Sequence, residues 1–333
     1  RVRVEGFYVE DYERDTLIYA REAAASLSGL NIKRDGLCLK NVEAEDAKFY
    51  LRETAVGVLN IHPIIAKLQN PNKKSDFRLY MSDVEVENFD FCYTTLEPRL
   101  PEYGMDYGDI RILNVDTRVE DFSVVGGAVS GDIVRFAADE PSGVRIDDLK
   151  GQFYVYEGII HVDNLNVETP YSSLSMPKMH INGDDWLQYK DYIHSVEMDM
   201  VAENSVVSTK DIGFFAPALR DWGVVLHDID VTFCGTVDDF EVVASDVALG
   251  EGSRVSATAH IVGMPEWQTS KYVVGVEKMH LVAEDVKPVL DAVTKGALSE
   301  RVMEIIDRVQ WLGARATVGG YLHSFRVAGN FNT

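Results

Sequence analysis

The chain has little of what a nucleic-acid-binding, metal-binding or membrane-spanning protein requires. It contains 32 Lys and Arg against 54 Asp and Glu, a net charge of −22, so it offers no basic surface for a phosphate backbone. Its three cysteines, Cys38, Cys92 and Cys234, lie far apart and form no CxxC pair, which excludes a disulfide framework or a zinc site and predicts buried free thiols. No run of 18 apolar residues exists, so no transmembrane helix is predicted.

Catalytic motifs are missing as well. The eight histidines show no HExxH or HxH spacing, and a Gly-x-Ser-x-Gly elbow does not occur around Ser130. Gly250-Glu251-Gly252 lacks a third glycine and is typical of a hairpin turn, and the aromatic residues from Trp186 to Tyr192 are expected to pack a loop against a sheet edge. We therefore predict that the chain is not an enzyme and needs no cofactor or metal.

What the sequence does contain is a recurring spacing of apolar residues, in steps of two, three and two, found about eleven times. The clearest copies are Leu37, Leu39, Val42, Ala44 and Leu79, Met81, Val84, Val86, which continue in step at a constant offset of 42 residues. Steps of two place side chains on one face of a strand. A three-residue step keeps the same face only if a β-bulge absorbs the extra residue.

Each three-residue step leaves a pair of residues between two apolar ones, and Asn and Asp are frequent in these pairs. They suit bulges and turns because their side chains hydrogen-bond locally. The pairs are Lys40-Asn41, Ser82-Asp83, Asp147-Asp148, Asp163-Asn164, His227-Asp228 and Asp238-Asp239. The distances between copies are irregular, which excludes the fixed rungs of a β-helix and favours a meander of long, curved strands. The predicted fold class is mainly β: an elongated, curved, mostly antiparallel sheet, trough-like, with a few short amphipathic helices.

Three segments break the strand pattern and show helical spacing: 56–69, 211–222 across Pro217, and 286–312, which is divided near Gly296. They suggest four parts: 1–109 with the first helix, 110–195, 196–275 with the second helix, and 276–333 with the last helices. A longer repeat of strand, helix and strands links the third and fourth parts, the second copy being truncated. Its marker is Gly-x-x-x-x-Phe, from Gly235 to Phe240 and again from Gly320 to Phe325.

The apolar stripes form the candidate binding site. Burial is worth about 0.8 kcal/mol per methylene, so a ~16-carbon acyl chain costs on the order of 12 kcal/mol to expose, and a carrier must cover it. The predicted groove-lining residues are Leu37, Leu39, Val42, Phe49, Leu51, Leu79, Met81, Val84, Val86, Phe89, Phe91, Ile112, Val115, Ile160, Val162, Leu165, Leu174, Met176 and Met179. The residues alone fit a second arrangement equally well, in which these side chains close on one another as a sandwich or barrel core.

The order of several short motifs resembles the AsmA/TamB superfamily, in particular the large TamB-type translocation and assembly proteins. The pieces that carry the resemblance are Asp15-Thr-Leu-Ile-Tyr-Ala20, Leu39-Lys-Asn-Val-Glu-Ala-Glu-Asp-Ala-Lys-Phe49, Ser142-Gly-Val-Arg-Ile-Asp-Asp-Leu149, Glu168-Thr-Pro-Tyr-Ser-Ser-Leu174, Asp211-Ile-Gly-Phe-Phe-Ala-Pro-Ala-Leu219, Ile261-Val-Gly-Met-Pro265 and the two Gly-x-x-x-x-Phe strands. Each is degenerate alone, and they are spread over most of the chain.

The resemblance implies an internal periplasmic segment of a longer protein that is anchored in the inner membrane. It implies a β-sheet trough that carries phospholipid, through its acyl chains, between the inner and outer membranes. It also implies an outer-membrane barrel partner, contacted through parts of the parent protein that lie outside this sequence. The alternative function is a scaffold that assists outer-membrane protein assembly by adding its sheet edge to a partner strand. No nucleic acid is expected as a partner under either function.

Overall fold

The computed structural model describes residues 1–27, 36–55, 57–63, 78–96, 104, 106, 108–215, 217–294, 296 and 300–333. Strands make up 66% and helices 14%, so the chain is mainly β, with a curved, unclosed and mostly antiparallel sheet. The chain divides into two compact units, 1–156 with 167–170, and 157–166 with 171–333. The boundary falls within the predicted 110–195 part, and the four-part division itself stays a prediction.

The strands of the first unit follow one another along the chain and pair with their neighbours. They are β1 (Val2–Glu10), β2 (Thr16–Leu27), β3 (Leu37–Arg52), β4 (Arg78–Thr94), β5 (Asp109–Val125), β6 (Ala128–Asp139), β7 (Arg145–Ile146) and β8 (Asp148–Tyr156). One pair, β3 with β4, is parallel. Its register runs from Leu37 opposite Leu79 to Arg52 opposite Thr94, an offset of 42 throughout. The offset seen in the sequence is therefore the lateral register of two neighbouring strands.

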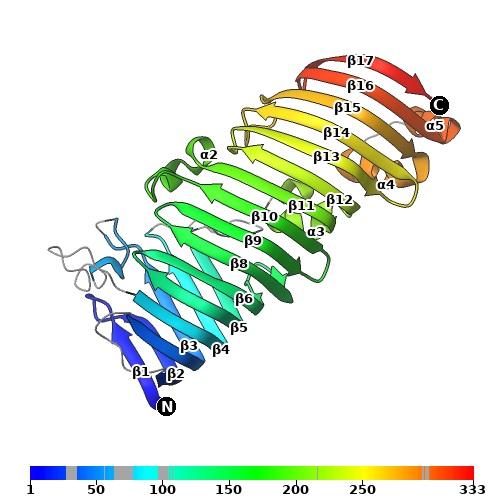
Figure 1. The fold of residues 1–333 in the computed structure, drawn as a ribbon. Helices are drawn as coiled ribbons and strands as arrows, with labels where there is room; N and C mark the ends of the chain where they lie inside the picture. Colours follow the sequence, from blue (N-terminus) through cyan, green and yellow to red (C-terminus); the bar gives the residue numbers. More distant parts are fainter. Residues whose placement is uncertain are drawn as a thin grey trace. The chain divides into compact units, whose positions relative to one another are not determined.

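The second unit continues the meander and adds short helices between strands (Figure 1). Its strands are β9 (Ile159–Glu168, whose last two residues belong to the first unit), β10 (Ser173–Asn182), β11 (Glu197–Ser208), β12 (Val225–Gly235), β13 (Asp239–Leu249), β14 (Ser253–Val262), β15 (Lys271–Val282), β16 (Trp311–Tyr321) and β17 (Ser324–Asn332). Its helices are η1 (Gln188–Asp191), α2 (Tyr192–Ser195), α3 (Thr209–Phe215), η2 (Pro217–Trp222), α4 (Ala283–Thr294) and α5 (Glu300–Val309). The pairs from β10–β11 to β16–β17 are all antiparallel.

Helices α3 and α4 each directly follow the end of a strand and contact that strand. α3 contacts β11, the strand it follows, and α4 contacts β15 in the same way, while η2, α4 and α5 contact one another in chain order. Asp285, at the start of α4, accepts hydrogen bonds from the backbone N–H of Gly252 (3.0 Å) and of Ser253 (2.8 Å) in the β13–β14 turn. Burial tends to raise the pKa of Asp285, but these bonds bring it below its ordinary 3.8. These hydrogen bonds thus hold the start of α4 against the β13–β14 turn.

The predicted bulges are present as left-handed Asn and Asp residues at three-residue steps. In the first unit they are Asp46, Asn88, Asn114 and Asp121, and in the second Asn164, Asn204, Asp228 and Asp246, with φ between 47° and 53°. Asn164 and Asp228 belong to pairs named from the sequence. Two other pairs take turn or break positions: Asp147 separates β7 from β8, and Asp238 lies in the β12–β13 turn, just before β13 begins at Asp239. In β3 the register against β2 shifts between Leu39 and Val42, at the predicted Lys40-Asn41 pair, although the backbone there is not left-handed. The left-handed residues of β3 and β4 are Asp46 and Asn88, at the next three-residue step.

Several expectations about helices and thiols need correction. Of the predicted 56–69 helix, residues 56 and 64–69 lie outside the described residues, and 57–61 form turns and a bridge, with only 62–63 helical. The physical reason is that Asn60 is buried and its amide binds the Asp11 carboxylate, which holds this segment in an irregular turn. Leu312 lies in β16 and not in a helix. Cys234 is exposed and Cys38 and Cys92 are half-buried, because their strand positions alternate away from the apolar face.

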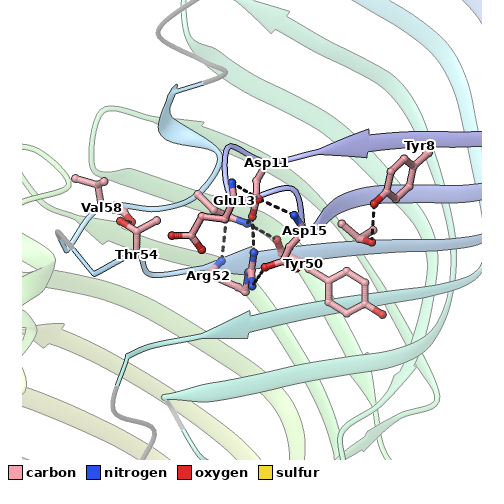
Figure 2. Close-up of polar contacts among 10 residues, drawn as sticks. Tyr8, Asp11, Glu13, Asp15, Tyr50, Arg52, Thr54 and Val58 are labelled. Carbon is pink, nitrogen blue, oxygen red and sulfur yellow. Dashed lines mark hydrogen bonds and ion pairs between the residues drawn. The ribbon is translucent and has the colours of Figure 1, made fainter.

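The turn after β1 is held by a buried carboxylate (Figure 2). Asp11 accepts hydrogen bonds from the backbone N–H of Glu13 (2.9 Å) and Asp15 (3.0 Å), from Asn60 (3.0 Å), and from the Arg52 guanidinium (2.5 Å). Burial tends to raise the pKa of Asp11, yet the bonds from Asn60, Arg52 and the backbone lower it overall. This cluster ties the β1–β2 turn to the end of β3 and the segment that follows.

Candidate functional site: an apolar sheet face

One face of the sheet in the first unit consists of apolar side chains aligned from strand to strand. Side chains that lie opposite each other on paired strands point to the same face, so the register alone assigns them. The longest row in this unit is Val2, Ala25, Val42, Val84, Val119, Ile133 and Gly151, one residue from each of β1 to β6 and from β8. At about 4.8 Å per strand it extends for about 29 Å.

Parallel rows continue this face along the strands. They are Leu27, Leu39, Met81 and Phe122; Leu37, Leu79, Val124, Val129 and Val155; Val4, Ala23, Ala44, Val86 and Thr117; Phe89 and Val115; Val9, Ile18, Phe49, Phe91 and Ile112; and Leu51, Tyr93 and Ile110. The rings of Phe49 and Phe91 touch at a centroid distance of 5.8 Å. All thirteen predicted lining residues of this unit, from Leu37 to Val115, lie in these rows.

The second unit has the same construction. Its central row is Met179, Met200, Phe233, Val242, Ala259, Val274, Val318 and Val327, one residue from each strand from β10 to β17. A neighbouring row is Ile181, Met198, Gly235, Phe240, Ile261, Tyr272, Gly320 and Phe325. Eight strands at about 4.8 Å give an apolar face about 34 Å long.

The remaining predicted residues lie in β9 and β10. Ile160 and Val162 are half-buried, and Leu165 is buried after the left-handed Asn164, so the three-residue step is accommodated as expected. Leu174 and Met176 are half-buried and precede Met179 along β10. The predicted lining list omits most of the second unit's face, including Phe233 and Val318. Their strands carry the same alternation of apolar residues, so the signal was present.

Burial decides between a groove and a packed core within each unit. Of the 19 predicted lining residues only Val115 and Leu165 are buried, and the other 17 are half-buried. The described core contains 14 buried apolar residues, of which 7 are alanines. Among the described residues, the helices make their main strand contacts with β11 and β15, each of which leads directly into a helix, and the sheet is unclosed. A closed sandwich core is therefore wrong for the described parts of either unit.

The face is hollowed near the last strands. A depression of about 260 Å³ is lined by Tyr272, Val274, Val318, Gly320, Tyr321, Leu322 and Phe325. Only glycine fits at position 320 of the lining, because a Cβ there would lie 2.3 Å from the backbone oxygen of Ser324. The Tyr272 hydroxyl donates to the Trp267 carbonyl oxygen (2.6 Å). The lining therefore presents carbon to the hollow.

The opposite face is polar. In the first unit it carries ion pairs between Arg118 and Asp83 (3.0 Å) and between Lys48 and Asp90 (3.3 Å). In the second unit His161 and His180 stack at 3.9 Å between ring centroids and bind Asn182 and Asp163. Exposed pairs of this kind add little stability, so their main effect is to keep this face hydrated. The two faces therefore differ sharply in polarity.

Other expected features are found at the rims. Tyr189 donates to the carbonyl oxygen of Gly158 (2.9 Å) and its ring contacts Trp186 and Tyr192, so the aromatic loop packs at a sheet end as predicted. Residues 250–252 form the β13–β14 turn. Within the described ranges, no helix is both long enough and apolar enough to cross a bilayer. The same ranges hold no group of His, Cys, Asp and Glu arranged for a metal ion.

Comparison with protein-family models, curated proteins and solved structures gives no match for this chain.

Proposed function

We propose that this chain carries phospholipid acyl chains along its apolar sheet face, as a periplasmic segment of a bridge between the inner and outer membranes. The observation that supports this most directly is the continuity of the longest rows: one row of the first unit crosses seven strands and two rows of the second unit cross eight, none with a charged residue. Such a face binds hydrocarbon by non-directional burial, which suits passage of a chain along it better than capture at one point.

The half-buried state of the rows supports the same proposal. A fully packed core leaves no apolar area for a ligand, whereas these side chains touch their lateral neighbours and keep carbon available on the open side. The half-buried methionines Met81, Met176, Met179 and Met200 add flexible, polarisable contacts that adapt to different chains. The headgroup stays in water beyond the face, so no specific polar pocket is required for it.

Native mass spectrometry of the purified chain tests the proposal. After incubation with vesicles of phosphatidylethanolamine and phosphatidylglycerol, we expect bound phospholipid at one or more equivalents, removed by detergent and restored on return to vesicles. A folded chain that stays free of lipid after this incubation would overturn the proposal.

A second candidate function is strand addition at a free sheet edge, with an assembling outer-membrane strand as the partner implied by the sequence resemblance. The observation that favours it is β17, whose nine residues are all exposed. It predicts capture of an extended peptide by lipid-free protein.

A further inference from the structure

The hollow near the last strands lies in one copy of the internal repeat, and the other copy shows the same place filled. Gly235 and Gly320, 85 residues apart, both have positive φ, 127° and 140°. A Cβ at either would lie 2.3 Å from a backbone oxygen and 2.8 Å from the Cα of the following Phe240 or Phe325. The β12–β13 and β16–β17 hairpins therefore share one backbone geometry, and their side chains can be compared position by position.

Strand pairing extends this comparison to β11 and β15. In the β11–β12 pair, Met198 lies opposite Gly235 and Met200 opposite Phe233. In the β15–β16 pair, Tyr272 lies opposite Gly320 and Val274 opposite Val318. Phe233 thus corresponds to Val318, so the second copy has a valine where the first has an aromatic ring.

In the first copy, side chains of the protein fill this place. The rings of Phe233 and Phe240 stack at 4.8 Å between centroids. Met198 is buried, and the hydroxyl of Tyr192 in α2 donates to its sulfur (3.2 Å). In the second copy the corresponding residues line the open hollow of about 260 Å³: Tyr272, Val274, Val318, Gly320 and Phe325. Carbon that the protein supplies in one copy is therefore missing in the other.

The hollow does not depend on what lies beside β17. In the first copy β14 pairs with β13 and continues the sheet, yet the groups that fill the place come from β11, β12, β13 and α2. The lining of the hollow likewise comes from β15, β16, β17 and the turn between the last two. The two copies differ in the side chains on these equivalent strands, and this difference opens the second one.

The hollow suits hydrocarbon that reaches it along the apolar face. Val274 and Val318 belong to the central row, so an acyl chain lying along this row meets the hollow over apolar side chains. A dry apolar cavity of about 150 Å³ holds one benzene molecule, so the hollow has room for several methylenes. We propose that it seats part of one phospholipid acyl chain, in the place that the Phe233 ring occupies in the first copy. This rests on the proposed lipid carriage and adds one preferred resting place to the path.

Photolabelling tests the seat. The 333-residue protein is incubated with vesicles of phosphatidylethanolamine and phosphatidylglycerol, a fraction of the former carrying a diazirine in one acyl chain, and the label is mapped by mass spectrometry after illumination. Val318→Phe restores the ring of the first copy and leaves both tyrosines of the lining in place, so their reactivity toward the label is kept. Val273→Phe is the matched control, because it adds the same ring to the opposite face of β15.

We expect the lining residues Tyr272, Tyr321 and Leu322 to be labelled in the wild-type protein. Their labelling should fall about fivefold or more in Val318→Phe, because a filled space offers a chain no contacts, and should stay within about twofold of wild type in Val273→Phe. Circular dichroism during heating checks that each variant folds. Val318→Leu, a smaller addition, takes the place of the phenylalanine variant if that variant does not fold, with a fall of about twofold expected.

Native mass spectrometry of the same samples separates the two proposals. Bound lipid whose label on the lining is unchanged in folded Val318→Phe would refute the seat and leave lipid carriage standing. Bound lipid that labels other rows and not the lining would refute it equally. A folded wild-type protein that binds no lipid would overturn both.

Discussion

Two adjacent valines in β15 allow the lipid-carrying face to be tested with a matched pair of substitutions. Val274 lies in the central row between Ala259 and Val318, is half-buried, and lines the hollow. Val273 points to the opposite face between His260 and Gly319 and is 41% exposed. The change of valine to glutamate is chemically the same at both positions. Only the face that receives the charge differs.

The expected effect follows from the hydration of the carboxylate. Glu at position 274 keeps water around it and prevents contact with about four methylenes of a passing chain, which at about 0.8 kcal/mol each is a loss of about 3 kcal/mol. That corresponds to about two orders of magnitude in local affinity. Val273→Glu adds a charge to a face that is already polar, so lipid binding should stay within about twofold. Both changes should cost at most about 1 kcal/mol of folding free energy, because neither side chain is fully buried.

The assay combines three measurements on the wild-type chain and both variants. Circular dichroism during heating establishes that each variant folds, native mass spectrometry counts bound lipid, and transfer of a fluorescent phospholipid between donor and acceptor vesicles gives the rate. We expect transfer to be lost in Val274→Glu and kept in Val273→Glu. Equal transfer by the two folded variants would refute the assignment of the apolar rows as the lipid path.

Three further predictions concern stability. The lowered pKa of Asp11 means that its contribution is fully present above its ordinary value of 3.8 and is lost as pH falls through the folded value, so the difference in melting temperature between wild type and Asp11→Asn should shrink below about pH 4. Asp285→Ala leaves two amides of the β13–β14 turn without their acceptor and should cost about 1–3 kcal/mol, with faster hydrogen exchange in that turn. Gly320→Ala should destabilise the β16–β17 hairpin by about 1–3 kcal/mol in denaturant unfolding, whereas Gly319→Ala, whose Cβ would meet open space, should be close to neutral.

Much of the fold could be predicted because the spacing of apolar residues along the sequence indicates which side of each strand is apolar. Alternation fixes the face, and the Asn or Asp at each three-residue step marks the bulge, as at Asn164 and Asp228. The 42-residue offset could also have predicted that β3 and β4 are neighbouring parallel strands. Matching patterns in Leu39 and Met81 are what two parallel strands in register require, yet the sequence equally permits them as distant copies. Only the parallel pairing of β3 with β4 in the structure distinguishes neighbouring strands from distant copies.

Other features could not be read from the sequence because they depend on distant partners. Val58 has helical spacing with its neighbours, but residues 57–61 form turns that include a bridge from Glu53 to Leu59 and a buried Asn60. In these five residues a contact from Asn60 to Asp11, 49 residues away, overrides the local helical pattern. Whether the stripes close into a core was likewise undetermined, since a sandwich strand and a groove strand alternate identically.

Some of the acidic residues on the polar face hold the bulges that keep the opposite face apolar. A bulge leaves a backbone N–H out of the regular ladder, and here a side chain of the next strand accepts it: Asn88 donates to Asp116 (3.0 Å), Asn204 to Asp230 (2.9 Å), and Asp246 to Ser256 (2.9 Å). Without these acceptors each three-residue step would leave an amide unsatisfied or let the register slip, and a slip of one residue would turn the apolar row toward water. The carboxylates on the polar face thus fix the register that keeps the opposite face continuous. Asp90, Asp116 and Asp230 therefore have a structural role as acceptors for the bulged strands, and this role needs no cationic partner.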